Sequence, residues 1–348
     1  MTGTIDTDLH CAPRTMGELA EYLPAYWQQY AAEGAIRLTD RQRSVYPAPD
    51  DGDVTTTAVP ATAEEIPDCR GSSRTPIRAT LLTCTVLFDL SRNPEFEAVG
   101  ARALNTWMRE TFLAVDPALF GSAVIPTLDT ERALAEVERI AEDGRFVQIL
   151  LPVRNDFRYG EPRYRRVLEA AAAADLVVCL HAGGRTGLSS SPTGYQSSFV
   201  EDTLLGQHRA AQNQLVSIAT SDLLVRHERF RLTLAECGFS WLPPLLWRLD
   251  KDWKSLWREI PWLDRKPSDH VLDRVRCTLE PGHLPVDDEE FRAAADMCEA
   301  PRTLMYSSDH PHRYRSAAQR LLSLLDDADR GRILHGNARE HYRRLPAE

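Results

Sequence analysis

Side chains that can bind a metal follow several apolar segments of the sequence, each at the point where the segment ends. They are Asp8, His10, His181, Glu236 and Asp309. Asp8 and His10 are two residues apart, so on a strand both side chains project to the same side. Histidine nitrogens and carboxylate oxygens together suit Zn, Mn or Fe(II). A metal with an open position can polarise a substrate oxygen or lower the pKa of bound water to around 7.

Each of these residues also has a structural interpretation when it is taken alone. A histidine that follows a strand, such as His181, is more often a hydrogen-bonded structural residue than a ligand. Asp309 suits a helix cap, and Glu236 suits a pair with an arginine. We favour the chemical interpretation because independent strands place ligand-type residues at the same end.

The segments that must position these residues alternate between strand and helix patterns. Apolar runs predict eight strands that begin near residues 5, 77, 122, 146, 176, 230, 275 and 303. Helical periodicity predicts helices over residues 16–32, 95–113, 130–142, 164–174, 199–219, 242–257, 287–298, 314–325 and 330–342. Such alternation indicates a parallel sheet, and eight βα units favour a closed (β/α)8 TIM barrel over an open Rossmann sheet. The first strand is not followed by GxGxxG, which argues against a dinucleotide site.

The chain is expected to form a single barrel domain over residues 1–348. Residues 40–76 are rich in Pro, Asp, Thr and Gly and lack clear periodicity. This stretch is longer than most loops of a compact domain, so we expect an irregular insertion that serves as a lid, an arm or an oligomer contact.

Composition excludes several classes of function. The formal net charge of -10 argues against a nucleic-acid or membrane-surface role. The sequence has no apolar run near the roughly 18 residues that a membrane span needs, and its start lacks a signal-peptide pattern. The seven cysteines are scattered and odd in number, which predicts free thiols in a reducing cytoplasm.

The chain resembles the amidohydrolase-related family typified by aminocarboxymuconate-semialdehyde decarboxylase and the dihydroxybenzoate decarboxylases. The stretches that carry the resemblance are Asp6–His10, Phe146–Pro152, Leu180–Gly184, Leu234–Phe239, Ser307–Pro311 and Ile333–Ala338. The resemblance implies a (β/α)8 barrel with one divalent metal, for which we expect Zn first and Mn or Fe as alternatives. It also implies a homodimer.

The resemblance implies a role for each matching residue. The metal ligands would be Asp8, His10, His181 and Asp309, and the catalytic residues would be Asp309, Glu236 and His181. Two positions depart from the family pattern, because Asp8 replaces His or Glu and Glu236 replaces a proton-transferring His. A glutamate can carry a proton if burial or a nearby anion raises its pKa, and it can equally serve as an additional ligand.

Three further residues are predicted to bind an acidic small-molecule substrate. Arg154 follows the fourth strand and Arg185 the fifth, where bidentate contacts would suit a carboxylate. His208 lies in the helix after the next loop and is expected to reach the site. Of the histidines that flank Asp309, we expect His310 to support the site without ligating and His312 to be a loop residue.

The sequence is compatible with three functions. The leading hypothesis is metal-dependent, nonoxidative decarboxylation of a small aromatic or unsaturated carboxylic acid. The second is hydrolysis of an amide, lactam or lactone by a metal-activated water, with Asp309 as the base. The third is a barrel that has lost catalysis and serves for binding, which the substitutions at Asp8 and Glu236 motivate.

Overall fold

The structure of the protein is a computed structural model that describes most of the chain. The described residues are 3–34, 38, 55–56, 59–66, 76–86, 92–184, 197–313 and 317–346. The expected insertion at 40–76 lies mostly outside these ranges.

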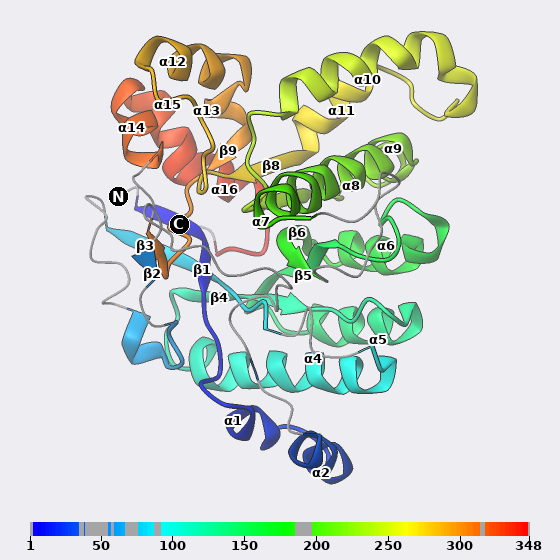
Figure 1. Cartoon of the computed structure of the whole chain (residues 1–348), viewed down its shortest axis with the longest axis vertical. Helices are drawn as coiled ribbons and strands as arrows, with labels where there is room; N and C mark the ends of the chain where they lie inside the picture. Colours follow the sequence, from blue (N-terminus) through cyan, green and yellow to red (C-terminus); the bar gives the residue numbers. More distant parts are fainter. Residues whose placement is uncertain are drawn as a thin grey trace.

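Eight parallel strands form a barrel, arranged in the order of the chain (Figure 1). They are β1 (Thr4–His10), β3 (Ile77–Thr83), β4 (Leu119–Val124), β5 (Phe146–Arg154), β6 (Val177–Gly184), β7 (Leu232–Ala235), β8 (Val275–Thr278) and β9 (Leu304–Met305). A parallel bridge between Leu9 and His310 joins the two edges, as does a 2.9 Å hydrogen bond from Thr7 N to Tyr306 O. The predicted (β/α)8 TIM barrel is therefore confirmed.

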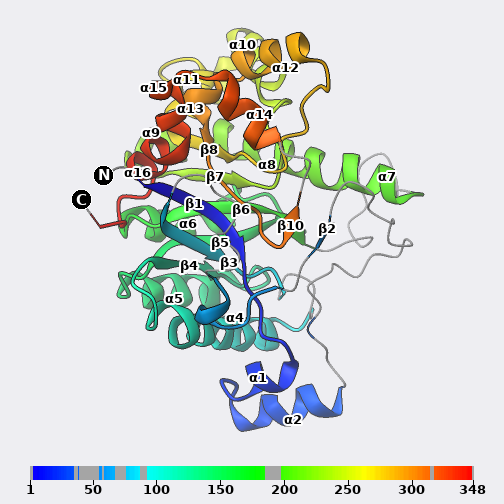
Figure 2. The same ribbon diagram turned by 90° about the vertical axis from the view of Figure 1, so that its left-hand side faces the viewer.

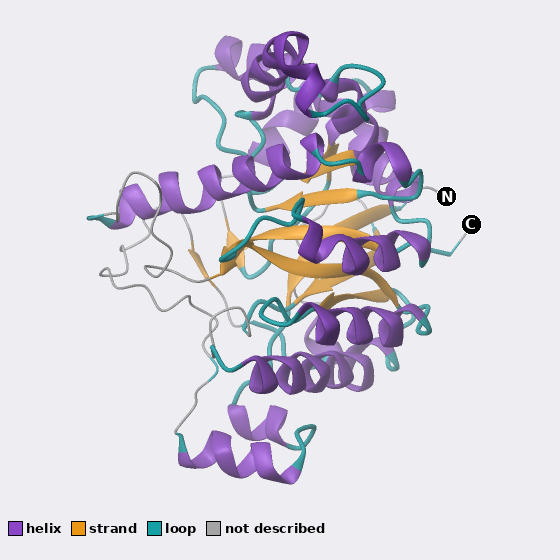
Figure 3. Cartoon of the chain, turned by 90° about the vertical axis from the view of Figure 1, so that its right-hand side faces the viewer, coloured by secondary structure: helices purple, strands orange, loops and turns teal. Residues whose placement is uncertain are grey.

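Helices surround the strands, as Figure 3 shows. The α-helices are α1 (Met16–Ala20), α2 (Ala25–Glu33), α4 (Pro94–Met108), α5 (Thr130–Ala141), α6 (Arg165–Ala173), α7 (Phe199–Glu201), α8 (Arg209–Thr220), α9 (Leu223–Arg226), α10 (Leu242–Leu256), α11 (Pro267–Arg274), α12 (Asp288–Met297), α13 (Ala300–Thr303), α14 (Ala317–Leu324), α15 (Asp327–Gly331) and α16 (Asn337–His341). Asn93 and Asp129 cap α4 and α5 by accepting hydrogen bonds from first-turn amides. None of the described helices is long and apolar enough to cross a membrane.

Short 3-10 and π segments interrupt or extend several helices. The 3-10 turns are η1 (Ala63–Glu65), η3 (Pro162–Tyr164) and η5 (Trp257–Glu259), and the π segments are η2 (Arg109–Leu113), η4 (Asp202–His208) and η6 (Arg332–Gly336). The single helix predicted over 16–32 was wrong, because the structure ends α1 at Ala20 and begins α2 after Pro24. Proline has no amide hydrogen and a fixed φ, so it suits the start of a helix better than its interior. Helix α11 was not predicted.

The strands are buried on both faces, as a parallel barrel requires. Every residue of β4, β5 and β6 is buried, which explains their continuous apolar sequences. Strand β1 is also fully buried, although it contains Asp6 and Asp8. The described cysteines are buried and free, as predicted.

The C-terminal helix closes the end of the barrel where the strands begin. Tyr342, just beyond α16, is fully buried against Ile5, Phe120 and Val147, which lie near the starts of their strands. Its hydroxyl donates to Oε1 of Gln148 at 3.0 Å and lies 3.0 Å from the Thr233 hydroxyl. This polar contact fixes the helix against the barrel interior.

Replacing Tyr342 by phenylalanine is expected to lower the free energy of unfolding by about 1–3 kcal/mol, because a buried amide oxygen loses its donor. Thermal unfolding measures the loss. The control is Tyr26→Phe, since the Tyr26 side chain is 69% exposed and its replacement should change stability by less than about 0.5 kcal/mol. Equal effects of the two substitutions would contradict the structural role of the Tyr342 hydroxyl.

Candidate metal centre and active site

Five ligand-type side chains meet at the carboxyl ends of the barrel strands. Asp8 and His10 lie on β1 and His181 on β6. Glu236 follows β7 directly, and Asp309 lies in the loop after β9. Carboxyl ends of parallel barrel strands share one rim, so the topology alone places these residues on the same side of the barrel.

A first group of ligand atoms comes from Asp8, His10, His181 and Glu236, and all four atoms lie within 4.8 Å of one another. Nε2 of His181 lies 3.3 Å from Oε1 of Glu236 and 3.5 Å from Oδ2 of Asp8. Nε2 of His10 lies 2.5 Å from the same Glu236 oxygen. Glu236 therefore sits between the two histidines.

A second, overlapping group joins the loop after β9 to the first. Its members are His10, Glu236, Asp309 and His312, within the same 4.8 Å limit. Oδ1 of Asp309 lies 3.1 Å from Nε2 of His10 and 2.9 Å from Nδ1 of His312. The structure thus brings together all four residues predicted as metal ligands, but Asp309 does not belong to the group that contains Asp8 and His181.

The backbone at the two acidic loop residues is strained. Glu236 has φ 54° and Asp309 has φ 50°, in the left-handed region that side chains other than glycine rarely adopt. Each conformation is held by a hydrogen bond, from Glu236 N to Oγ1 of Thr278 and from Asp309 N to the Asp8 carbonyl, both 3.0 Å. Such strain costs on the order of 1–3 kcal/mol and is concentrated at functional sites.

Opposite charges stabilise one another in this buried cluster. Burial alone would lower the pKa of His181, but the carboxylates of Glu236 and Asp8 raise it to about 10. Burial would raise the pKa of Glu236, yet His181 and His10 hold it well below its usual range. For Asp309, burial and the Glu236 carboxylate raise the pKa to about 6.

The polar atoms of the first group fit a divalent cation. The His181 ring donates from Nδ1 to the Ala182 carbonyl at 2.6 Å, which leaves Nε2 to face Asp8 and Glu236. That Nε2 and both carboxylate oxygens of Asp8 are buried and make no hydrogen bond within the described residues. Buried polar atoms without partners are costly, and a bound cation would satisfy them. Two nitrogen and two carboxylate ligands match a Zn or Mn site.

Arg154 is paired with another residue of the protein. Its Nη1 and Nη2 donate to the two carboxylate oxygens of Asp202 at 3.0 and 2.9 Å, and the two side chains are 4% and 5% exposed. A Cβ added to Gly206 would lie 2.6 Å from Nη2 of Arg154, so a larger residue there would displace the guanidinium. Substrate binding by Arg154 stays a prediction, and it would require Asp202 to release the guanidinium.

His208 and Arg185 are the other two residues that were predicted to bind the substrate. His208, at the end of η4, stacks edge-on against His283 with ring centroids 4.8 Å apart. A Cβ added to Gly238 would lie 3.7 Å from Nε2 of His208, which places this histidine beside the loop that follows Glu236. Arg185 lies outside the described residues.

His312 is the site residue that the sequence interpretation missed, because it was taken as a loop residue. Its position three residues after Asp309 was the available signal. The short strand β10 (His312–Arg313) pairs with β2 (Thr55–Thr56) in an antiparallel ribbon, which is visible in Figure 2. The described part of the 40–76 segment therefore reaches the mouth of the barrel beside His312.

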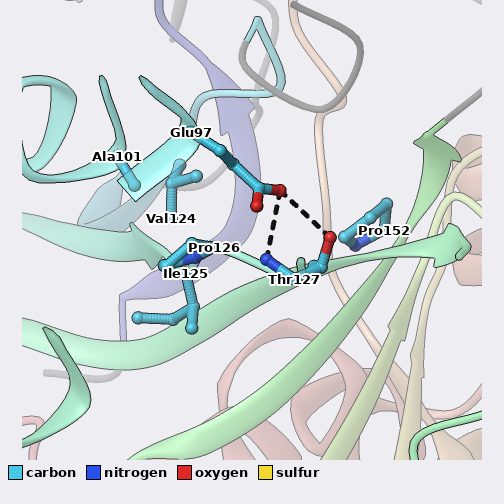
Figure 4. Close-up of a pocket in the computed structure, with 7 residues that line it drawn as sticks. All are labelled: Glu97, Ala101, Val124, Ile125, Pro126, Thr127 and Pro152. Carbon is cyan, nitrogen blue, oxygen red and sulfur yellow. Dashed lines mark hydrogen bonds between the residues drawn. The ribbon is translucent and has the colours of Figure 1, made fainter. Parts of the chain in front are cut away.

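A separate small crevice lies at the ends of β4 and β5, shown in Figure 4. It is lined by Glu97, Ala101, Val124, Ile125, Pro126, Thr127 and Pro152. Oε1 of Glu97 accepts hydrogen bonds from the amide and the hydroxyl of Thr127 at 3.1 and 3.0 Å, so this carboxylate fixes the turn after β4. The crevice shares no residue with either ligand group.

Glu280, which follows β8, is a further buried carboxyl, close enough to Asp309 for the two charges to interact. Oε1 accepts a hydrogen bond from Ala318 N at 2.8 Å, and Oε2 has no hydrogen-bond partner in the described structure. Burial raises the pKa of Glu280 to about 7, from a usual value of 4.5.

Replacing Glu280 by glutamine is expected to stabilise the protein above pH 7 and to change it little near pH 4.5. As the pH rises from 4.5 to 7, the unfolded chain loses the Glu280 proton while the folded protein keeps it, so wild-type stability falls by about 3 kcal/mol. Thermal unfolding of both proteins at pH 5 and pH 8 measures the difference. A stability difference between the two proteins that stays the same at pH 5 and pH 8 would contradict the raised pKa of Glu280. Glu289→Gln, at an exposed position, is the control.

The chain matches the sequence profile of the amidohydrolase family over residues 5–344. The chain belongs to this family. It is therefore a member of a family of enzymes, and its fold is the barrel that the resemblance implied. Among proteins with curated descriptions, none matched the chain.

Several solved structures have the same fold as this chain. A 5-carboxyvanillate decarboxylase from Sphingomonas paucimobilis has a TM-score of 0.67 and 20% identity, with 99% of each chain covered. A dihydroxybenzoic acid decarboxylase from a Polaromonas species, with bound manganese and the inhibitor 2-nitroresorcinol, has a TM-score of 0.63 and 19% identity, covering 100% of this chain and 98% of that one. An amidohydrolase from Mycobacterium avium subsp. paratuberculosis has a TM-score of 0.72 and 17% identity, covering 98% and 99%.

Proposed function

We propose that this amidohydrolase uses one divalent metal to decarboxylate a small aromatic or unsaturated carboxylic acid without an oxidant. The observation that carries the proposal is the buried set of Asp8, His10, His181 and Glu236, in which Asp8 and His181 present polar atoms without hydrogen bonds. The fold similarity to a carboxyvanillate and a dihydroxybenzoic acid decarboxylase supports this reaction.

A divalent metal, when bound, would polarise a substrate oxygen. The ligands would come from Asp8, His10 and His181, with Asp309 as the fourth that the resemblance implies. In the reaction the bond between the carbon skeleton and its carboxylate breaks, CO2 leaves, and the remaining electron pair takes up a proton. That proton would come from Glu236 or Asp309, which both lie beside His10. We keep Zn as the first expected ion, with Mn as the alternative because the dihydroxybenzoic acid decarboxylase contains manganese.

The test is CO2 release from a panel of hydroxybenzoic and enoic acids, measured with metal-loaded protein. We expect release from at least one acid, and its loss after the metal is removed with a chelator. Buffer with free metal is the control. No release from any acid by metal-loaded protein would contradict the proposal.

Hydrolysis of an amide, lactam or lactone is the second candidate. It is favoured by Asp309, because a buried carboxyl with its pKa raised to about 6 suits a general base. Reactions run in water enriched in oxygen-18 separate the two candidates. Label in the product supports hydrolysis, whereas unlabelled product with released CO2 supports decarboxylation.

We also propose that the protein is a cytoplasmic homodimer. Exposed apolar residues on and after α10 support an interface between two copies, since Trp247, Leu256 and Trp257 are 60%, 51% and 45% exposed. Sedimentation analysis tests this, and a monomer at micromolar concentration would contradict it.

A further inference from the structure

We propose that the amino-terminal end of the barrel holds a binding site for a small oxyanion of the phosphate class, formed by Arg231, Arg274 and Arg276. All three arginines lie at the starts of β7 and β8. The candidate metal centre lies at the carboxyl ends of the strands, so the two sites are at opposite ends of the barrel. The proposed metal-dependent function does not use these arginines, and the inference goes beyond it.

The first argument is that two of the guanidinium groups meet at one atom. Arg231 directly precedes β7, and Arg274 ends α11 directly before β8. The two strands are parallel neighbours, with Leu232 opposite Val275. Nη1 of Arg231 and Nη1 of Arg274 both donate to the carbonyl oxygen of Glu228, the first at 3.1 Å. Two positive charges therefore lie side by side at this end of the barrel.

The second argument is that Arg276 adds a buried donor without a partner. Arg276 is the second residue of β8, and Thr233 of β7 lies opposite it. Its Nη1 donates to the carbonyls of Leu272 and Val275 at 2.9 and 2.8 Å. Its Nε is buried and has no hydrogen-bond partner among the described residues, and the whole residue is only 9% exposed. A buried N–H without an acceptor is costly, and an anion oxygen would satisfy it.

The third argument is that no carboxylate neutralises the three arginines. Within the part of the chain that the structure describes, Arg231, Arg274 and Arg276 donate only to backbone carbonyls, and their Nη2 atoms make no hydrogen bond. Burial and the charges of Arg343, Arg274 and Arg276 lower the pKa of Arg231 to about 10. Because like charges repel, an anion bound between these groups would relieve the repulsion.

The arrangement of the donors fits a small oxyanion. A guanidinium presents its N–H groups in a planar fork that matches phosphate and carboxylate oxygens. Arg231 and Arg274 are half-buried, so an ion from solvent can reach them. A phosphate group carries about 1.5 to 2 negative charges at pH 7 and three acceptor oxygens. A long polyanion such as nucleic acid fits less well, because the net charge of -10 on the chain would repel its outlying phosphates.

The test is isothermal titration calorimetry of the full-length protein with inorganic phosphate, at an ionic strength of about 0.15 M, where diffuse surface attraction is screened. We expect one ion to bind per chain with a Kd below about 1 mM. Phenyl phosphate, titrated separately, distinguishes a phosphate ester from the inorganic ion, and tighter binding of one of them identifies the preferred source. Absence of saturable binding of both ions would overturn the proposal.

Substitutions locate the bound ion. Arg231→Gln and Arg274→Gln are each expected to weaken phosphate binding by about tenfold or more, because each removes a charged donor. Arg231→Lys keeps the charge without the planar fork, so its loss should be smaller. The matched control is Arg229→Gln at the same end of the barrel, since Arg229 already pairs with Asp175 at 3.3 Å and its loss should be less than about threefold.

Two results with these variants would overturn the proposal. Equal losses in Arg229→Gln and Arg231→Gln would show a general attraction to positive charge in place of a defined site. Unchanged binding in both Arg231→Gln and Arg274→Gln would place the ion elsewhere on the protein. Circular dichroism melts show whether each variant is folded, and Arg231→Lys keeps the test decisive if a glutamine variant does not fold.

Discussion

Replacing His181 by alanine is expected to weaken divalent-metal binding by more than about 100-fold and to abolish turnover with it. His181 belongs to the ligand set in every assignment of this site, and its Nε2 is buried between the carboxylates of Asp8 and Glu236. Loss of a residue that only supports a ligand typically costs about 10–100-fold in affinity, so loss of a ligand should cost more. Dialysis against Zn(II) or Mn(II), followed by elemental analysis, measures the effect.

His208→Ala is the matched control for this experiment. His208 lies near the same rim but contacts His283, and it belongs to neither ligand group. Its replacement should leave the metal content unchanged. Equal metal content in His181→Ala and wild-type protein would show that the metal, if bound, sits elsewhere.

Replacing Arg154 by methionine is expected to lower the free energy of unfolding by about 3–5 kcal/mol. The substitution leaves the Asp202 carboxylate, which is 5% exposed, without its bidentate partner. Removing both charges in Arg154→Met/Asp202→Leu should restore most of the loss, because a buried pair can be replaced by apolar side chains at little cost. Thermal unfolding of the wild-type, single and double variants measures these differences.

The exposed pair of Arg166 and Glu131 is the control, since its side chains are 65% and 71% exposed. Arg166→Met should change stability by about 0–1 kcal/mol. If Arg154→Met proves as mild as this control while substrate affinity falls sharply, Arg154 serves the substrate as the sequence predicted, and the pair with Asp202 is secondary.

The barrel could be predicted from the sequence because its signals are local. Strands such as β5 and β6 are buried along their whole length, so they appear as continuous apolar runs between helical patterns. The predicted helix over residues 16–32 was wrong because one residue, Pro24, interrupts the helical pattern between α1 and α2. The short strand β9 was recognisable because polar residues follow it at Asp309.

The candidate site could be predicted from the sequence only in part. Topology alone places Asp8, His10 and His181 on one rim, because all three lie on parallel strands. The relative positions of Glu236 and Asp309 depend on left-handed backbone conformations, which no sequence pattern specified. Arg154 finds its partner 48 positions away in the π segment η4, a contact that depends on tertiary packing.

The most direct test of the account is anomalous X-ray scattering from crystals of the metal-loaded protein, recorded at the Zn and Mn absorption edges. One strong peak is expected about 2.0–2.3 Å from ligand atoms of Asp8, His10 and His181. Absence of a peak between these residues at either edge, in protein shown by elemental analysis to contain metal, would contradict it.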